Sequence, residues 1–184
     1  INHALAANGG VATGSTAISP APNANDGSRA WAVGGAWKDS TAGAYPDTLQ
    51  INFAGTKTVD EISVFAVRDD YTNTTPPDET TTTSLYSLVA FDVQYWTGTA
   101  WATLPGGNVT GNNKAWKKIT FAPTSTSAIR VVVNLASSDG YSRIAELEAW
   151  GNEAGSPPPT PTPTPTPTAT VTPTPTPTVT PTAT

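Results

Sequence analysis

The C-terminal part of the chain, residues 157–184, consists almost entirely of Pro and Thr. Each Pro removes a backbone hydrogen-bond donor, and neither residue type supplies an apolar face. The segment therefore cannot pack a core, and we expect an extended polyproline-II rod. Thr alternating with Pro is also the composition of O-glycosylated stalks. Residues 1–151 must then hold the folded domain, and residues 152–184 form a Gly/Ser/Pro-Thr-rich linker or stalk.

Composition excludes several classes of function. Charged residues make up 12% of the chain and the net charge is −5, whereas nucleic-acid and anionic-membrane partners call for a basic surface. The chain has no Cys, which excludes disulfide scaffolds, thiolate catalysis and Cys-ligated zinc. Apolar runs such as Ile129–Val133 are too short to span a bilayer. Together with the stalk, this predicts a secreted, extracellular or cell-surface protein with no membrane insertion.

The rest of the sequence shows short segments of β type. Apolar and small or polar residues alternate in Ile62–Val67 and Asp92–Trp96, and Thr97-Gly98-Thr99 has the composition of a hairpin turn. Many short strands joined by such turns predict an all-β fold, an antiparallel β-sandwich. The expected strands are Thr48–Phe53, Thr58–Val67, Leu88–Trp96, Ala100–Leu104, Trp116–Phe121, Ala128–Asn134 and Arg143–Trp150.

The lengths of the links predict where binding residues gather. Successive strands of an antiparallel sandwich usually run in opposite directions, so alternate links share an end. The short links at one end are Ala54–Lys57, Thr97–Thr99 and Ala122–Ser127. The long links at the other are Ser28–Asp47, Arg68–Ser87, Pro105–Ala115 and Leu135–Ser142. Binding residues concentrate on such loops, so the candidate ligand-binding residues are Arg29, Trp31, Arg68, Asp69, Asp70, Tyr71, Asn112, Asn113 and Tyr141.

The segment Arg68-Asp69-Asp70-Tyr71 is the densest group of these candidates. Its polar side chains could hydrogen-bond sugar hydroxyls while Tyr71 or Trp31 stacks on a pyranose face, the mixture that ligand sites need. The alternative is a solvated loop with a local ion pair and a Trp31 that caps the core. The other large indoles are assigned to the core: Trp37, Trp96, Trp101 and Trp150.

Glu146 and Glu148 lie two residues apart on the last expected strand, so both point to the same side. Two like charges so close are unfavourable unless a cation lies nearby. Asp26, followed by Gly27, offers a hard oxygen ligand in the first long loop. The alternative is that both glutamates face water at a sheet edge.

The sequence favours a protein that is not an enzyme. Glycosidases need two carboxylates that face each other across a cleft, but the acids here are adjacent or i, i+2 pairs on single segments. A Ser–His–Asp triad needs a positioned base, and the single histidine, His3, lies near the start of the chain.

Several segments carry a family resemblance, and they occur in the family's order over nearly all of residues 1–151. They include Asn2-His3-Ala4-Leu5-Ala6, Asn25-Asp26-Gly27-Ser28-Arg29, Trp37-Lys38-Asp39, Thr48–Phe53, Phe91–Trp96, Ile129–Val133 and Arg143–Glu148. The chain resembles the discoidin or coagulation-factor type C domain, whose galactose-binding-like fold is shared by the bacterial family 32 carbohydrate-binding modules.

The resemblance implies a jelly-roll β-sandwich with one structural Ca²⁺ and a ligand, often a galactose-type sugar, held by loops at the rim. The sugar-contacting His of galactose-binding members has no match here. The family places its Ca²⁺ between the segments around Asp26 and Glu146, so the resemblance implies a metal site drawn from Asp26, Ser28, Glu146 and Glu148 with backbone carbonyls.

Two functions follow as hypotheses. The first is a non-catalytic glycan-binding or adhesion module on a Pro–Thr stalk, joined to a partner such as a glycoside hydrolase. The second is a subunit of an extracellular filament in which identical neighbouring subunits hold the tail, because a rod of residues 157–184 would span roughly 85–90 Å. Asn73-Thr74-Thr75 and Asn108-Val109-Thr110 are N-glycosylation sequons. The expected O-glycan carriers are Thr160, Thr162, Thr164, Thr166 and Thr168.

Overall fold

The computed structural model describes residues 1–152. The predicted polyproline-II rod and the expected O-glycan carriers therefore lie outside the described residues. The strands are β1 (Val11–Gly14), β2 (Trp37–Lys38), β3 (Asp47–Phe65), β4 (Leu88–Trp96), β5 (Trp101–Val109), β6 (Trp116–Ala136), β7 (Arg143–Ile144) and β8 (Glu146–Asn152). Three short helices accompany them: η1 (Ala6–Asn8), η2 (Ala21–Ala24) and α1 (Trp31–Gly34). None of these helices is long and apolar enough to cross a membrane.

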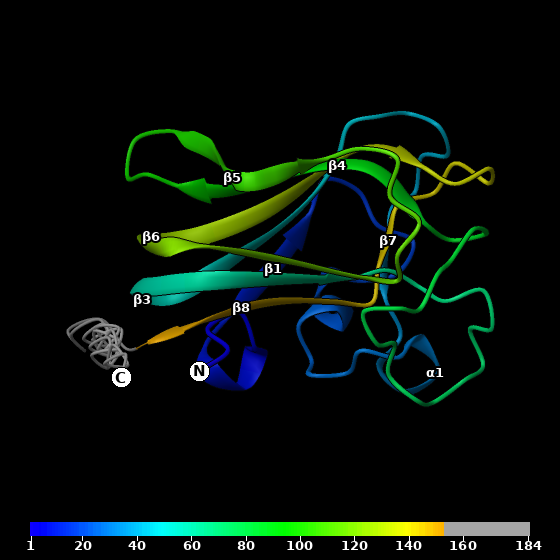
Figure 1. The fold of residues 1–184 in the computed structure, drawn as a ribbon, viewed down its shortest axis with the longest axis horizontal. Helices are drawn as coiled ribbons and strands as arrows, with labels where there is room; N and C mark the ends of the chain where they lie inside the picture. Colours follow the sequence, from blue (N-terminus) through cyan, green and yellow to red (C-terminus); the bar gives the residue numbers. More distant parts are fainter. Residues whose placement is uncertain (153–184) are drawn as a thin grey trace, which may run out of the picture.

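The main sheet is antiparallel and folds over on itself. Its strand order is β1-β3-β6-β4-β5, and β8 pairs with β3. Residues 47–52 of β3 pair with β1 and the second half of β6, whereas residues 58–65 pair with β8 and the first half of β6. The register shifts between Asn52 and Lys57, and Gly55 there has a φ of 81°. Figure 1 shows β3 and β6 turning back at one end of the molecule, which confirms the predicted β-sandwich.

The core lies between the two layers. Leu49 and Ile51 of β3 alternate with more exposed residues and are fully buried, as are Ile62 of β3 and Leu147 of β8 from the opposite layer. Each fully buried Leu or Ile contributes about 1.5–3 kcal/mol of hydrophobic free energy. The period-2 pattern predicts the inward side correctly in residues 47–53 of β3. The alternation expected in Ile62–Val67 is wrong, because all six residues are buried and Phe65 and Val67 belong to a second apolar cluster.

The assignment of the indoles to the core was only partly correct. Trp37 is fully buried, and its indole N–H donates to the carbonyl of Thr16 at 3.0 Å. Trp96, Trp101 and Trp150 are only half-buried. Trp96 and Trp101 flank the β4–β5 hairpin turn. An indole is amphipathic, so its presence on a strand does not decide between core and surface.

The ends of the sandwich differ as the link lengths predicted. In Figure 1 the short turns of β3, β4–β5 and β6 lie at one end, and the long loops and α1 lie at the other. A small second sheet pairs β2 with β7, with Trp37 opposite Ile144 and Lys38 opposite Arg143. This pairing joins the first long loop to the segment after the fourth.

Candidate functional site

A pocket of about 240 Å³ opens at the long-loop end. Its lining comes from segments far apart in the sequence: Ser19, Trp31, Ala36, Lys38, Val67, Tyr71, Tyr86 and Arg143. Two of the predicted binding residues, Trp31 and Tyr71, are among them, and Tyr141 borders the pocket through its contact with Lys38.

One wall of the pocket is aromatic. Trp31 is 42% exposed and Tyr71 is 43% exposed, which is high for such large apolar side chains. Their rings meet edge to face with centroids 4.9 Å apart, and Tyr71 meets Tyr86 in the same way at 6.1 Å. Trp31 opens α1, a single turn whose backbone places the indole at the surface. The three rings, set at steep angles to one another, form a continuous and partly exposed apolar wall.

The other wall is basic. Lys38 and Arg143 are direct partners in the β2–β7 pair. The ammonium of Lys38 lies 3.9 Å above the Tyr141 ring, and the guanidinium of Arg143 lies 4.9 Å from the Tyr86 centroid. Arg143 also donates to Asp139 Oδ1 at 3.0 Å, whereas Lys38 makes no ion pair within residues 1–152. The pocket therefore combines aromatic faces with N–H donors of net positive charge.

The ion pair sets the charge state of Asp139. Burial acts to raise the pKa of this carboxyl, but the hydrogen bonds from Arg143 and from the Tyr141 amide outweigh it, so the pKa lies below its usual value. Asp139 therefore stays ionised and holds Arg143 in place at neutral pH.

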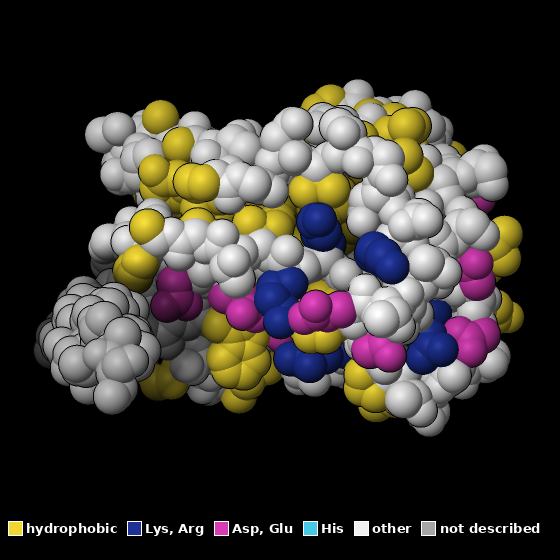
Figure 2. Space-filling view, viewed as in Figure 1, with side chains coloured by type: hydrophobic (Ala, Val, Ile, Leu, Met, Phe, Trp, Pro, Cys, Tyr) yellow, Lys and Arg dark blue, Asp and Glu magenta, His cyan; other side chains and the backbone are white. Residues whose placement is uncertain are grey.

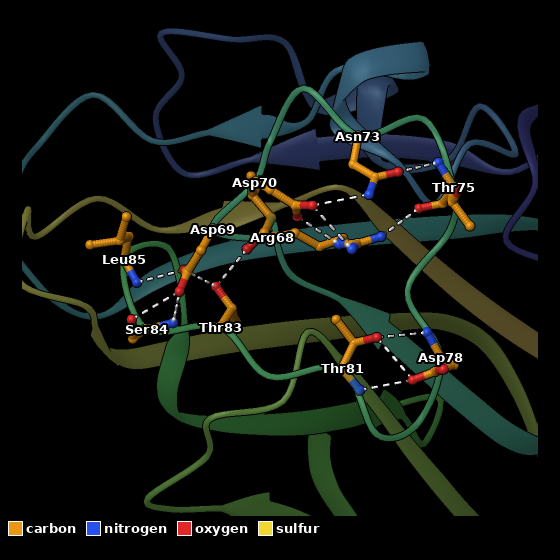
Figure 3. A network of polar contacts seen from close by, with 11 residues as sticks. Arg68, Asp69, Asp70, Asn73, Thr75, Asp78, Thr81, Thr83, Ser84 and Leu85 are labelled. Carbon is orange, nitrogen blue, oxygen red and sulfur yellow. Dashed lines mark hydrogen bonds and ion pairs between the residues drawn. The ribbon is translucent and has the colours of Figure 1, made fainter.

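The second long loop is built around Asp69 (Figure 3). The Asp69 carboxylate accepts hydrogen bonds from Thr83 Oγ1 at 2.8 Å, from the Ser84 amide at 2.9 Å and from the Leu85 amide at 2.8 Å. Burial acts to raise the pKa of Asp69, but these donors outweigh it and the pKa is lowered. The side chain thus closes the loop upon itself.

Arg68 and Asp70 serve the same loop. The Arg68 guanidinium lies 3.0 Å from Asp70 Oδ1 and donates to the Thr75 carbonyl at 2.8 Å, and Asp70 accepts from Asn73 (Figure 3). The structure therefore agrees with the local ion pair that the sequence left open as the alternative. These residues shape the loop that presents Tyr71, and they do not line the pocket.

The remaining predicted binding residues also hold the scaffold. Arg29 makes a forked ion pair with Glu148, at 2.7 and 2.9 Å, and stacks 4.9 Å over Phe65. Asn112 donates to the Leu88 and Lys114 carbonyls. The Asn113 carbonyl accepts from the Thr83 amide.

Sequence reasoning missed Ser19, Lys38, Tyr86 and Arg143, all of which line the pocket. One signal could have pointed to Lys38, Tyr86 and Arg143: each lies within a long link or directly after one, and each carries a basic or phenolic side chain. The pairing of Lys38 with Arg143 leaves no such trace, because it joins residues on two unrelated segments.

The segments around Asp26 and Glu146 meet at a second polar site. Glu146 is fully buried, and its Oε1 accepts from the Gly27 amide at 3.1 Å. Its Oε2 is buried and has no partner among residues 1–152. Burial, followed by the charge of Asp26, raises the pKa of Glu146 to about 8. A buried carboxyl with one unused oxygen beside a second acid is an arrangement that a cation would stabilise.

The donor set around these acids suits Ca²⁺. No group of three or more His, Cys, Asp or Glu side chains that could hold a metal occurs in the described part of the chain. Ca²⁺, however, also accepts carbonyl and hydroxyl oxygens, and Ser28 lies beside Asp26, whose Oδ1 accepts from the Ser28 amide at 2.7 Å. A Cβ at Gly34 would lie 2.4 Å from Asp26 Oδ2, so the backbone here fits closely around the carboxylate. Glu148 is different, because Arg29 and the Trp150 indole already occupy its oxygens.

Charges elsewhere are mixed. On the face shown in Figure 2, basic and acidic side chains are interspersed over the half that carries the long loops, and apolar side chains gather near the β4–β5 hairpin.

A hollow of about 510 Å³ beside Gly27 and Trp150 is larger than the aromatic pocket. Its charged groups, Arg29 and Glu148, are already paired with each other, so the aromatic pocket offers more to a ligand.

Comparison with known proteins identifies the fold. No family model and no curated protein matches the sequence. Among solved structures, a family 32 carbohydrate-binding module from Clostridium perfringens in complex with galactose is 19% identical, with a TM-score of 0.56 over 76% of this chain and 92% of that one. A chitosan-binding module of a Paenibacillus chitosanase/glucanase, in complex with chitotriose, is 23% identical, with a TM-score of 0.57 over 82% and 100%. A fucose-binding module from Streptococcus pneumoniae is 17% identical, with a TM-score of 0.58 over 82% and 94%.

These similarities show the class of fold. Residues 1–152 form a discoidin-like, galactose-binding-like β-sandwich of the kind found in family 32 carbohydrate-binding modules. The resemblance inferred from the sequence is thereby confirmed at the level of the fold.

Proposed function

We propose that this protein is a non-catalytic carbohydrate-binding module whose long-loop pocket holds the sugar. The observation that carries the proposal is the pocket itself, in which exposed Trp31 and Tyr71 face the donors Lys38 and Arg143. Structures of the same fold that bind galactose, chitotriose and fucose support it.

The chemistry of the two walls suits a pyranose. The C–H face of a sugar ring stacks on Trp31 or Tyr71 and removes these exposed rings from water. Lys38 and Arg143 donate N–H groups to hydroxyl oxygens, and Ser19 can donate or accept. At about 240 Å³ the pocket is slightly smaller than the roughly 300–1,000 Å³ of drug-sized sites, so it suits a single sugar unit or a chain end.

The lining of the pocket supports binding without catalysis. None of the lining residues is Asp or Glu, whereas hydrolysis of a glycosidic bond calls for two carboxylates that face each other across the bond. Asp139, an acid that contacts the lining residue Arg143, is held by it in an ion pair.

We further propose that Asp26, Ser28 and Glu146 hold a structural Ca²⁺ together with backbone carbonyls, and that Glu148 serves the ion pair with Arg29. A bound Ca²⁺ would supply the counter-charge that the buried Glu146 carboxylate lacks. It would also tie the first long loop, and with it the α1 turn that carries Trp31, to β8.

The setting of the module rests on the sequence. Secretion, display on a Pro–Thr stalk, a tethered glycoside hydrolase and the alternative of a filament subunit all depend on residues outside the described range. They remain predictions.

A glycan array followed by calorimetric titration of the best ligand tests the proposed function. We expect a ligand, and we expect Trp31→Ala or Tyr71→Ala to weaken its binding at least about tenfold, as for aromatic anchors at other interfaces. Trp101→Ala, a matched aromatic variant at the opposite end, should leave it unchanged. An array with no ligand, or equal losses in all three variants, would contradict the proposal.

A further inference from the structure

A second aromatic hollow lies beside the β4–β5 hairpin, whose turn is at the short-turn end of the sandwich in Figure 1. Its volume is about 290 Å³, and its lining is Gln50, Asn52, Trp96, Trp101, Ser127 and Ala128. We call it the hairpin groove, because Trp96 ends β4 and Trp101 begins β5 directly opposite. Gly98, with a φ of 100°, forms the tight turn between them.

The indoles of the hairpin groove are fixed in place but open to a ligand. Their centroids are 5.5 Å apart at an interplanar angle of 62°. The buried Thr126 hydroxyl anchors the hairpin to β6: it donates to the Trp96 carbonyl at 2.9 Å and accepts from the Trp96 amide at 3.2 Å. Both indoles remain partly exposed. The groove is thus preformed, which lowers the entropic cost of binding.

Hydrogen-bond donors without acceptors border the groove. Within residues 1–152 neither the Trp96 nor the Trp101 indole N–H has a protein acceptor, whereas those of Trp37, Trp116 and Trp150 do. An incoming ligand with free acceptors could therefore use both indoles.

Amide and guanidinium groups add to this donor set. The Gln50 side chain donates to Asn52 Oδ1 at 3.0 Å, which leaves the Asn52 NH₂ exposed. The Arg130 guanidinium stacks 4.4 Å from Trp101 and donates to Gln94, and it makes no ion pair in the described part of the chain. The groove therefore suits a ligand with apolar rings and many free acceptors.

We propose that the hairpin groove binds the chain's own Pro–Thr segment. A polyproline-II strand makes no internal hydrogen bonds, so its carbonyls are all available as acceptors, and its Pro rings pack on aromatic side chains. Residues 159–168 alternate strictly between Pro and Thr and carry no charged side chain. Every three-residue turn of such a strand presents at least one Pro, so the segment can dock in several registers.

The place where the segment leaves the sandwich favours this occupant. β8 ends at Asn152, which pairs with Thr58, just after the turn of β3 at the short-turn end. In Figure 1, β8 thus ends at the short-turn end, and in the sequence it is followed by the linker and the Pro–Thr segment. At about 3.1 Å per residue, the segment is long enough to reach its own groove or that of a neighbouring copy. This inference does not depend on the proposed glycan site.

Indole N–H signals in ¹H–¹⁵N NMR spectra test the proposal on the full-length chain. The protein is a variant in which every Pro of residues 157–181 is replaced by Ser, so that its own tail cannot compete. The probe is a synthetic peptide of residues 159–168. We expect the Trp96 and Trp101 signals to shift saturably with a submillimolar Kd, while the other indole signals stay in place.

Groove variants and a control peptide make the test decisive. Trp101→Ala should weaken peptide binding at least about tenfold. Trp101→Phe keeps a ring and the hairpin packing but loses the N–H donor, so it should bind the peptide more weakly than the wild type and more tightly than Trp101→Ala. Trp31→Ala should have no effect. A peptide with Ala in place of each Pro should not bind. If the peptide causes no shift at about 2 mM, or if a glycan ligand from the array moves the Trp96 and Trp101 signals and the peptide does not, the proposal is wrong.

Discussion

The buried Glu146 carboxyl makes the stability of the metal-free protein depend on pH. Its pKa is raised from 4.5 to about 8, so the folded state holds this proton more tightly than the unfolded chain does. The favourable contribution is complete below pH 4.5 and is lost as the pH rises toward 8. At about 1.4 kcal/mol per pKa unit, the loss approaches about 5 kcal/mol above pH 8. For a chain of this size that corresponds to roughly 10–20 °C in melting temperature.

The substitution Glu146→Gln should remove this dependence and reverse the effect of Ca²⁺. In EDTA at pH 8.5 the neutral amide should make the variant more stable than the wild type. In Ca²⁺ the wild type should gain about 2.7 kcal/mol at a concentration of 100 times Kd, whereas the variant should gain much less. Glu79→Gln, at an exposed acid, serves as the matched control and should behave like the wild type.

Thermal unfolding followed by circular dichroism, at pH 5, 7 and 8.5 in EDTA and in Ca²⁺, measures these changes in melting temperature. If the metal-free wild type melts at the same temperature at pH 5 and pH 8.5, Glu146 does not titrate as the structure indicates. If Glu146→Gln responds to Ca²⁺ as strongly as the wild type does, the metal is bound elsewhere.

Three further predictions concern the scaffold and the pocket. Arg29→Ala should lower the free energy of unfolding in urea by about 2–4 kcal/mol, because it leaves the buried Glu148 without its cation. The control Lys118→Ala, whose partner is exposed, should lower it by about 0–1 kcal/mol, and equal losses in the two variants would contradict the prediction. Asp69→Ala should lower the free energy of unfolding by about 1–3 kcal/mol and also weaken glycan binding, because the loop that presents Tyr71 loses the hydrogen bonds that close it. Unchanged glycan affinity in a folded variant would contradict the proposed role of Asp69. Lys38→Ala should weaken glycan binding roughly fivefold in calorimetric titrations with an unchanged melting temperature, and an unaltered affinity would remove Lys38 from the site.

Local patterns in the sequence were sufficient for the fold class and for the end at which the loops gather. Alternation in Asp92–Trp96 fixes which side chains face inward, because the β period of two is a local property. The lengths of successive links predict which loops share an end of the sandwich, because antiparallel strands reverse direction at every turn. Residues 157–184 cannot pack a core in any context, because Pro and Thr offer too little apolar surface.

The tertiary structure alone decided which residues form the site. Arg29 and Glu148 are separated by 119 positions and meet only when the first loop docks on β8. Lys38 and Arg143 become neighbours only through the β2–β7 pair. The charges of Arg68 and Asp70, which are plain in the sequence, are used within their own loop. Which partner a polar side chain takes depends on long-range docking, and a single sequence records the side chain but not the partner.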